Sequence, residues 1–212
     1  MSGPVRFAAG GYRYIPSVFQ YSAGIAALDG FAVERVRLRR PLPLADAFAF
    51  VERHLAAIGR PATAFAACEL RSPAQFSEAG FIAFNQHYCE TLARWGIYDP
   101  ANRFNPVARS NVCPLIDFPS EPCFHAFCYT VPSSVGARDF VISGSGEAPE
   151  GKPNYRDHIV RPGDTSPEGL RIKADYVLDE MERRLAALGV SWREVTATQV
   201  YSVCDVRPLI VL

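Results

Sequence analysis

The alternation of apolar and polar residues predicts most of the strands of this 212-residue chain. The clearest case is residues 31–38 (FAVERVRL), where apolar residues recur at every second position. Shorter apolar runs bounded by Gly and Pro predict further strands at 5–14, 18–28, 63–70, 108–116, 123–130, 139–145 and 196–206.

Apolar residues spaced by three and four predict three helices. The first contains Leu44, Ala47, Phe48, Val51, Leu55 and Ile58 and ends at Gly59. The second covers residues 77–95 and carries Phe81, Phe84, Tyr88, Leu92 and Trp95. The third begins with Ser166 as N-cap and Pro167 in the first turn, and Gly189 ends it. The resulting order of strands and helices favours an α+β fold.

Two strand–helix–strand stretches of the chain resemble each other. Residues 53–59 (RHLAAIG) match 183–189 (RRLAALG), and residues 68–71 (CELR) match 204–207 (CDVR). Tyr21–Gly24 corresponds in position to Ile142–Ser145. We interpret this as a duplicated module, complete in residues 1–132 and partial in residues 133–212.

Composition narrows the function classes. Lys+Arg and Asp+Glu are both 22, so the chain lacks the basic excess typical of nucleic-acid binding. No apolar run is long enough to span a membrane, and residues 1–11 lack the order of a signal peptide, so we expect a cytoplasmic protein.

Six cysteines without a CxxC spacing indicate buried free thiols. Cys123 and His125 share a strand face that Cys128 does not, so we expect no metal or other cofactor.

The sequence Ala108-Arg109-Ser110-Asn111-Val112 is the candidate ligand-binding motif. An arginine on a strand presents a planar fork of donors that matches a carboxylate. Asn111 shares the face of Arg109 at a spacing of two. A half-exposed surface arginine on a strand is the alternative interpretation.

The order of these motifs resembles the Rid superfamily, the YjgF-type reactive-intermediate deaminases. The resemblance is carried by the Ser- and Gly-containing strand 21–27, the helix ending in Gly59, the strand ending in Glu69, Asn85–Tyr88 in the second helix, and Ala108–Val112. It implies a chorismate-mutase-like fold, with a mixed sheet and helices packed on one face, and here an internal duplication. It also implies a homo-oligomer, either a trimer or a pseudo-symmetric variant of one.

The resemblance further implies hydrolysis of a small imine or enamine that carries a carboxylate, with release of ammonia. Arg109 is then the carboxylate-binding residue, and Ser110, Asn111, Tyr21 and Ser22 are candidate neighbours in the substrate site. Family members often use an acidic residue in the last strand, but residues 123–128 (CFHAFC) contain none. His125 is the candidate to replace it, because histidine moves protons near neutral pH. A histidine satisfied by a backbone group is the alternative.

Three functions therefore remain open. The first is a deaminase of a 2-aminoacrylate- or 2-aminomuconate-like substrate. The second is a chorismatase-like enzyme acting on an enol ether that carries a carboxylate, since Pro162-Gly163-Asp164 resembles the second domain of those enzymes. The third is a small-ligand-binding or assembly protein without catalysis.

Overall fold

The computed structural model describes residues 3–102, 104–135, 138–152 and 154–209. The chain divides into two compact units, Met1–Ser143 and Gly144–Leu212. In the described ranges, no helix has the length and apolar character needed to cross a membrane. Each unit is taken by itself below.

The larger sheet of the first unit has the strand order β4-β7-β5-β6. Its members are β4 (Phe31–Pro43), β7 (Cys123–Pro132), β5 (Phe65–Arg71) and β6 (Ala108–Val112). β5 pairs with β6 in parallel and with β7 antiparallel, which confirms the predicted mixed sheet.

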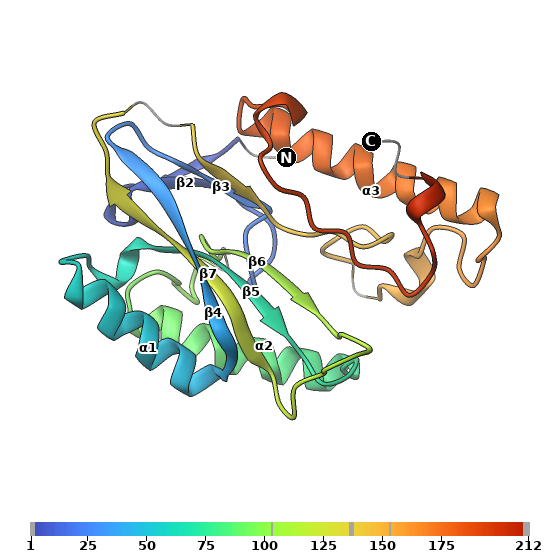
Figure 1. Ribbon diagram of the computed structural model, residues 1–212, viewed down its shortest axis with the longest axis horizontal. Helices are drawn as coiled ribbons and strands as arrows, with labels where there is room; N and C mark the ends of the chain where they lie inside the picture. Colours follow the sequence, from blue (N-terminus) through green and yellow to red (C-terminus); the bar gives the residue numbers. More distant parts are fainter. Residues whose placement is uncertain (1–2, 103, 136–137, 153, 210–212) are drawn as a thin grey trace. The chain divides into compact units, whose positions relative to one another are not determined.

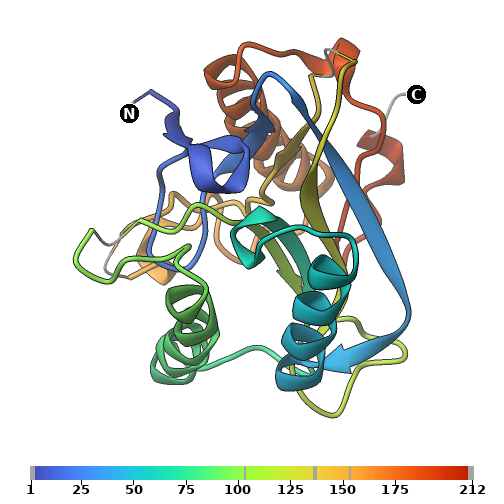
Figure 2. The same cartoon turned by 90° about the vertical axis from the view of Figure 1, so that its left-hand side faces the viewer.

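Two helices, α1 (Leu44–Ala57) and α2 (Glu78–Arg94), cover one face of this sheet (Figures 1 and 2). Five residues of the predicted α1 stripe are buried, namely Leu44, Ala47, Phe48, Val51 and Leu55. Ile58, just past the helix, is instead 45% exposed. Gly59 has a φ of 69°, a conformation that favours glycine. Ser77 caps α2 by accepting a hydrogen bond from the Gly80 N–H at 3.1 Å. Phe48 lies at the centre of the resulting core, with its ring centroid 5.1–6.4 Å from those of four aromatic residues, Phe65, Tyr88, Trp95 and Phe124.

A smaller antiparallel sheet packs against the other face. It has the order β1-β2-β3-β8, formed by β1 (Val5–Phe7), β2 (Tyr12–Ile15), β3 (Gly24–Ala27) and β8 (Phe140–Ile142). Tyr12 and Ile25 of this sheet form a second buried cluster with Ala67, Ala108 and Cys128 of the larger one. The larger sheet is therefore covered by helices on one side and partly by strands on the other.

Several strands are shorter than the apolar runs predict. A 3₁₀ turn at Ala8–Gly10 interrupts the expected strand 5–14, and the expected strand 18–28 forms only at Gly24–Ala27. β6 ends at Val112 instead of residue 116, and β8 covers three residues of the predicted 139–145.

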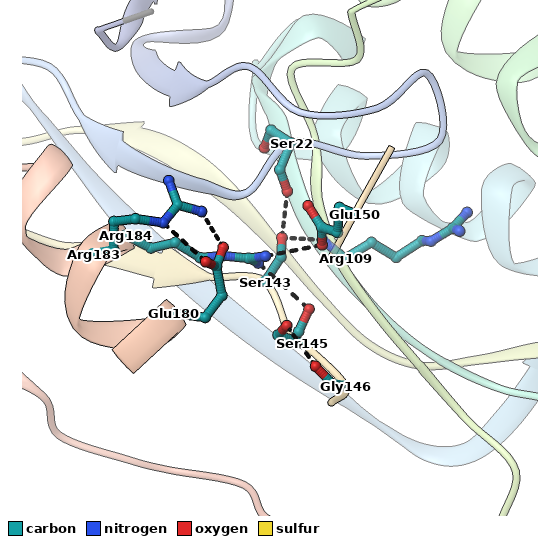
Figure 3. A network of polar contacts seen from close by, with 10 residues as sticks. Ser22, Arg109, Ser143, Ser145, Gly146, Glu150, Glu180, Arg183 and Arg184 are labelled. Atoms are coloured by element: carbon teal, nitrogen blue, oxygen red, sulfur yellow. Dashed lines mark hydrogen bonds and ion pairs between the residues drawn. The ribbon is translucent and has the colours of Figure 1, made fainter. Parts of the chain in front are cut away.

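The second unit is built on α3 (Pro167–Ala187), capped by Ser166 as predicted. Arg184 on this helix is fully buried and pairs with Glu180 at 2.8 Å and Glu150 at 2.9 Å (Figure 3). Lys173 likewise contacts Glu147 and the Val160 C=O, so both ends of the segment 146–163 are fixed to α3. Residue 153 of that segment lies outside the described residues.

The prediction of a strand at residues 196–206 is wrong. Residues 195–206 adopt no regular secondary structure. The described part of the second unit contains no strand with which this segment could pair. A strand requires a neighbour to satisfy its backbone groups, and sequence propensity alone does not provide one.

Replacing Phe48 with Ala is expected to lower the free energy of unfolding by about 3–5 kcal/mol, because it removes the ring at the centre of the aromatic core. Urea denaturation followed by circular dichroism measures this change. Glu52→Ala, on the exposed side of the same helix, is the control and should change stability by less than about 0.5 kcal/mol. Equal effects of the two substitutions would contradict this assignment of the core.

Candidate carboxylate-binding site

Arg109 lies on β6 with its side chain directed toward α2. Its guanidinium donates from Nη2 to the Asn85 Oδ1 at 2.6 Å. The Asn85 amide in turn donates to the Phe81 C=O at 2.7 Å, one turn earlier on α2. The second bond orients the Asn85 side chain so that its oxygen faces the arginine.

Three aromatic rings surround the guanidinium. Its carbon lies 4.8 Å from the ring centroid of Tyr88, 5.2 Å from that of Tyr21 and 5.9 Å from that of Phe84. These are cation–π distances, and they stabilise a positive charge in a site with little water. Tyr21, a predicted neighbour in the substrate site, thus lies against the Arg109 guanidinium, and its role in substrate binding stays a prediction.

The charge of Arg109 has no acidic partner among the described residues. Its side chain forms no ion pair there, although the residue is only 4% exposed. The Nη1 atom is buried and has no hydrogen-bond acceptor. Arginine remains charged in proteins, and a buried charge with an unsatisfied donor is costly. Such an atom is suited to bind an incoming carboxylate.

The backbone of Arg109 is fixed by two buried serines (Figure 3). The Arg109 N–H donates to the Ser143 Oγ at 3.0 Å, and the Ser143 hydroxyl donates to the Ser22 C=O at 2.5 Å. The Ser22 hydroxyl donates to the Pro106 C=O at 3.0 Å. Ser22 and Ser143 thus position the strand that carries Arg109, with their hydroxyls occupied by backbone groups.

Tyr88 and Cys68 form a buried pair beneath the guanidinium. The Tyr88 Oη and Cys68 Sγ atoms are 3.3 Å apart. Burial raises the pKa of Tyr88 well above its ordinary value, and the Arg109 charge only partly opposes this. Burial likewise raises the pKa of the Cys68 thiol to about 12. Both groups are protonated at neutral pH.

The structure places the other predicted site residues in different positions. Asn111 lies on the Arg109 face and accepts a hydrogen bond from Ser72 through its Oδ1 at 2.9 Å. Ser110 faces the opposite side of the strand, where its hydroxyl is buried without a partner. Asn85 and Tyr88 complete the site, and their spacing of three on a helix is the sequence signal for them.

His125 is separated from Arg109 by the sheet. Burial lowers the pKa of His125, and nearby Arg71 lowers it further while Glu69 opposes this. Glu69 and Arg71 lie on either side of Leu70 in β5. Leu70 and Cys68, which lies next to Arg109, are buried on the face of the sheet that the helices cover. Glu69 itself pairs with Arg35 at 2.7 Å. A second polar cluster, made of His125, Glu69, Arg71 and Arg35, therefore lies on the face opposite Arg109.

Comparison with known proteins gives a consistent match over almost the whole chain. The family model for the 2-aminomuconate deaminase CnbZ matches residues 4–211. A 2-amino-5-chloromuconate deaminase from Comamonas testosteroni is 56% identical over 212 residues, which is 99% of this chain and 84% of that protein. No solved structure matches the chain significantly.

Replacing Ser143 with Ala is expected to lower the free energy of unfolding by about 1–3 kcal/mol, because it leaves the buried Arg109 N–H and Ser22 C=O without this partner. Chemical denaturation measures the change. Ser134→Ala, at an exposed position, is the matched control and should be neutral. A neutral Ser143→Ala variant would show that the serine does not fix the strand.

The lowered pKa of His125 predicts a pH effect on stability. As pH falls below about 6.5, the unfolded chain binds a proton at this residue before the folded chain does, so stability decreases with acidification. His125→Gln should remove this contribution and flatten the dependence of unfolding free energy on pH between about 7 and 5. Identical slopes for parent and variant would contradict the lowered pKa of the partly buried imidazole.

Proposed function

This chain belongs to the 2-aminomuconate deaminase CnbZ family, and from that premise we propose that it hydrolyses a 2-aminomuconate-like imine or enamine acid and releases ammonia. The relative from Comamonas testosteroni supports this substrate class, since its name describes a deaminase of a chlorinated 2-aminomuconate. The Rid-like order of motifs supports a hydrolytic route.

The observation that carries the proposal is the unpaired Nη1 donor of Arg109. A substrate carboxylate placed there supplies both the missing acceptor and the missing negative charge. Asn85 holds Nη2, so the guanidinium is oriented before the ligand arrives. A carboxylate bound to an arginine that is already desolvated and oriented gains a stronger interaction than one bound in water.

The aromatic walls support a planar, conjugated substrate. A 2-aminomuconate-like acid is a flat chain of alternating double bonds, which can lie against the rings of Tyr21, Phe84 and Tyr88. Tyr21 and Phe84 are only partly buried, whereas Tyr88 is fully buried. We infer that ligand entry displaces the two outer rings, and that their return excludes water from the bound carboxylate.

The reaction needs one water molecule and two proton transfers to nitrogen. Water oxygen bonds to the imine carbon while one proton reaches the nitrogen, which gives a carbinolamine. Its hydroxyl proton then reaches the nitrogen as the C–N bond breaks, leaving a ketone and ammonia. Among the rings that contact Arg109, Tyr88 carries a phenol kept protonated by burial, so it can donate a proton but not act as a base near neutral pH. Tyr88 contacts the Arg109 guanidinium, whereas His125 lies on the opposite face of the sheet. Tyr88 is therefore favoured over His125 as the proton carrier.

Arg109→Ala is expected to lower kcat/KM for ammonia release from freshly generated 2-aminomuconate by at least about 100-fold, because a desolvated carboxylate loses its charged partner. Arg109→Lys should recover little of this activity, since a lysine keeps the charge without the planar fork. A coupled assay for ammonia measures both rates.

The matched control is Arg94→Gln, which removes an exposed arginine from α2 and should leave the rate unchanged. The parent should also turn over 2-aminomuconate faster than 2-aminoacrylate, which lacks the conjugated chain. A folded parent that releases no ammonia, or an Arg109→Ala variant as active as the parent, would contradict the proposed function.

A further inference from the structure

Asn111 presents a second polar group on the face of the sheet that carries Arg109. In the pairing of β5 with β6, Arg109 lies beside Cys68 and Asn111 beside Leu70. Paired residues of neighbouring strands direct their side chains to the same face, and Cys68 and Leu70 are both buried beneath the helices. The side chains of Arg109 and Asn111 therefore share that face, one after the other along β6.

Ser72 fixes the amide of Asn111. Ser72 follows β5 and is fully buried, and its N–H donates to the Val112 C=O at 2.9 Å. Its hydroxyl donates to the Asn111 Oδ1 at 2.9 Å, so the amide oxygen is occupied. The Asn111 Nδ2 group offers two N–H donors, which have no hydrogen-bond acceptor among the described residues. Asn111 is only partly buried, so these donors are accessible to a ligand.

N–H donors without an acceptor in the described chain thus occur on two residues of β6, at Nη1 of Arg109 and at Nδ2 of Asn111. Two residues of a strand advance by about 6.6 Å through six backbone bonds. The two carboxyl carbons of an extended six-carbon dicarboxylate are five bonds apart, which is a similar span. Such a molecule matches the spacing of the two residues along the strand.

Aromatic rings extend from Arg109 toward the segment that contains Ser72. The Phe84 ring centroid is 5.9 Å from the guanidinium carbon of Arg109. Phe84 also stacks on Phe76 with centroids 4.9 Å apart, and the centroid of Phe76 is 6.0 Å from that of Phe81. Phe76 belongs to the segment that joins β5 to α2 and begins at Ser72. These rings provide an apolar surface against which a conjugated chain can pack.

We propose that Ser72 and Asn111 form a second subsite, which binds the distal carboxylate of a conjugated six-carbon dicarboxylate while Arg109 binds the carboxylate beside the reacting carbon. This inference rests on the proposed function, since it assigns the other end of the same substrate. Asn111 donates from Nδ2 to the distal carboxylate, and Ser72 is a positioning residue that acts through the Asn111 amide. The subsite selects ligands by their length and by their second carboxylate.

A structural role for the pair is the alternative, in which the Ser72 hydroxyl only ties the ends of β5 and β6 together. A structural role predicts that loss of the pair weakens the binding of every ligand equally. A subsite predicts that only ligands with a second carboxylate are affected. Two stable acids with the same carbon skeleton separate these cases. They are trans,trans-muconate, a dicarboxylate, and sorbate, in which a methyl group replaces one carboxylate.

The first test is calorimetric titration of both acids into the parent, and it requires no variant to fold. The parent should bind muconate at least about 10-fold more tightly than sorbate, because one additional hydrogen bond to a charged group contributes about this much. Either end of muconate can occupy Arg109, which by itself accounts for about two-fold. A parent that binds the two acids within about two-fold of each other, or that binds neither, would overturn the proposal.

The second test changes the subsite. Asn111→Leu, which keeps the size of the side chain and removes its donors, should bring the affinity for muconate to within about two-fold of that for sorbate and leave sorbate binding unchanged. Ser72→Ala should change the ratio in the same direction, whereas Ser72→Thr, which keeps the hydroxyl, should retain the parent's ratio. Asn102→Leu, in the exposed turn after α2, is the control and should keep both affinities. Equal losses for the two acids in Asn111→Leu, or an unchanged ratio, would contradict the subsite.

The ammonia assay separates this proposal from the proposed function. If the protein releases ammonia from 2-aminomuconate through Arg109 but binds muconate and sorbate alike, the subsite is wrong and the proposed function stands. If the protein releases no ammonia but prefers muconate through Asn111, the proposed function is wrong and the subsite stands as part of a dicarboxylate-binding site.

Discussion

The guanidinium of Arg109 is a buried positive charge without an acidic partner in the described chain, and the rest of the site is arranged around it. Asn85 satisfies one terminal nitrogen, three aromatic rings face the charge, and the other terminal nitrogen is left unpaired. Proteins tolerate such a charge when its partner is a ligand. This arrangement supports the proposed carboxylate substrate, and the chain's family is named for a deaminase of 2-aminomuconate, a dicarboxylate.

The position of the guanidinium depends on segments far apart in the sequence. β6 supplies the arginine, α2 supplies Asn85, Phe84 and Tyr88, and the segment before β3 supplies Tyr21. Ser143, next to β8, reaches across to the Arg109 backbone and to Ser22. The smaller sheet thereby fixes the edge of the larger sheet at the residue that we propose binds the substrate. A change in either sheet is therefore expected to shift the guanidinium of Arg109.

Local pattern was sufficient to predict the helices and the face they cover. The spacing in α1 and α3, with Gly59, Ser166 and Gly189 at their ends, encodes structure within a few residues. The same is true of Arg109, because its motif and position on a strand follow from the nearby sequence. Tyr21 was expected near it only through the family resemblance.

The failures have a common physical cause in contacts that the local sequence does not specify. His125 has suitable chemistry, but alternation along β7 does not say which face meets Arg109; that depends on how β5, β6 and β7 pair. Segment 196–206 has strand propensity but no strand neighbour among the described residues of its own unit. The Ser143 bond to Arg109 joins residues that are 34 positions apart.

The most direct test of the central claim is calorimetric titration of cis,cis-muconate, a dicarboxylate without the amino group, into parent and Asn85→Asp. The new carboxylate lies beside Arg109 Nη2 and supplies the negative charge that the ligand otherwise provides. The account predicts binding to the parent and loss of at least about 10-fold in affinity for Asn85→Asp above the pKa of the new acid, with recovery as that acid is protonated. Equal affinity of the two proteins at all pH values would show that Arg109 does not bind the carboxylate.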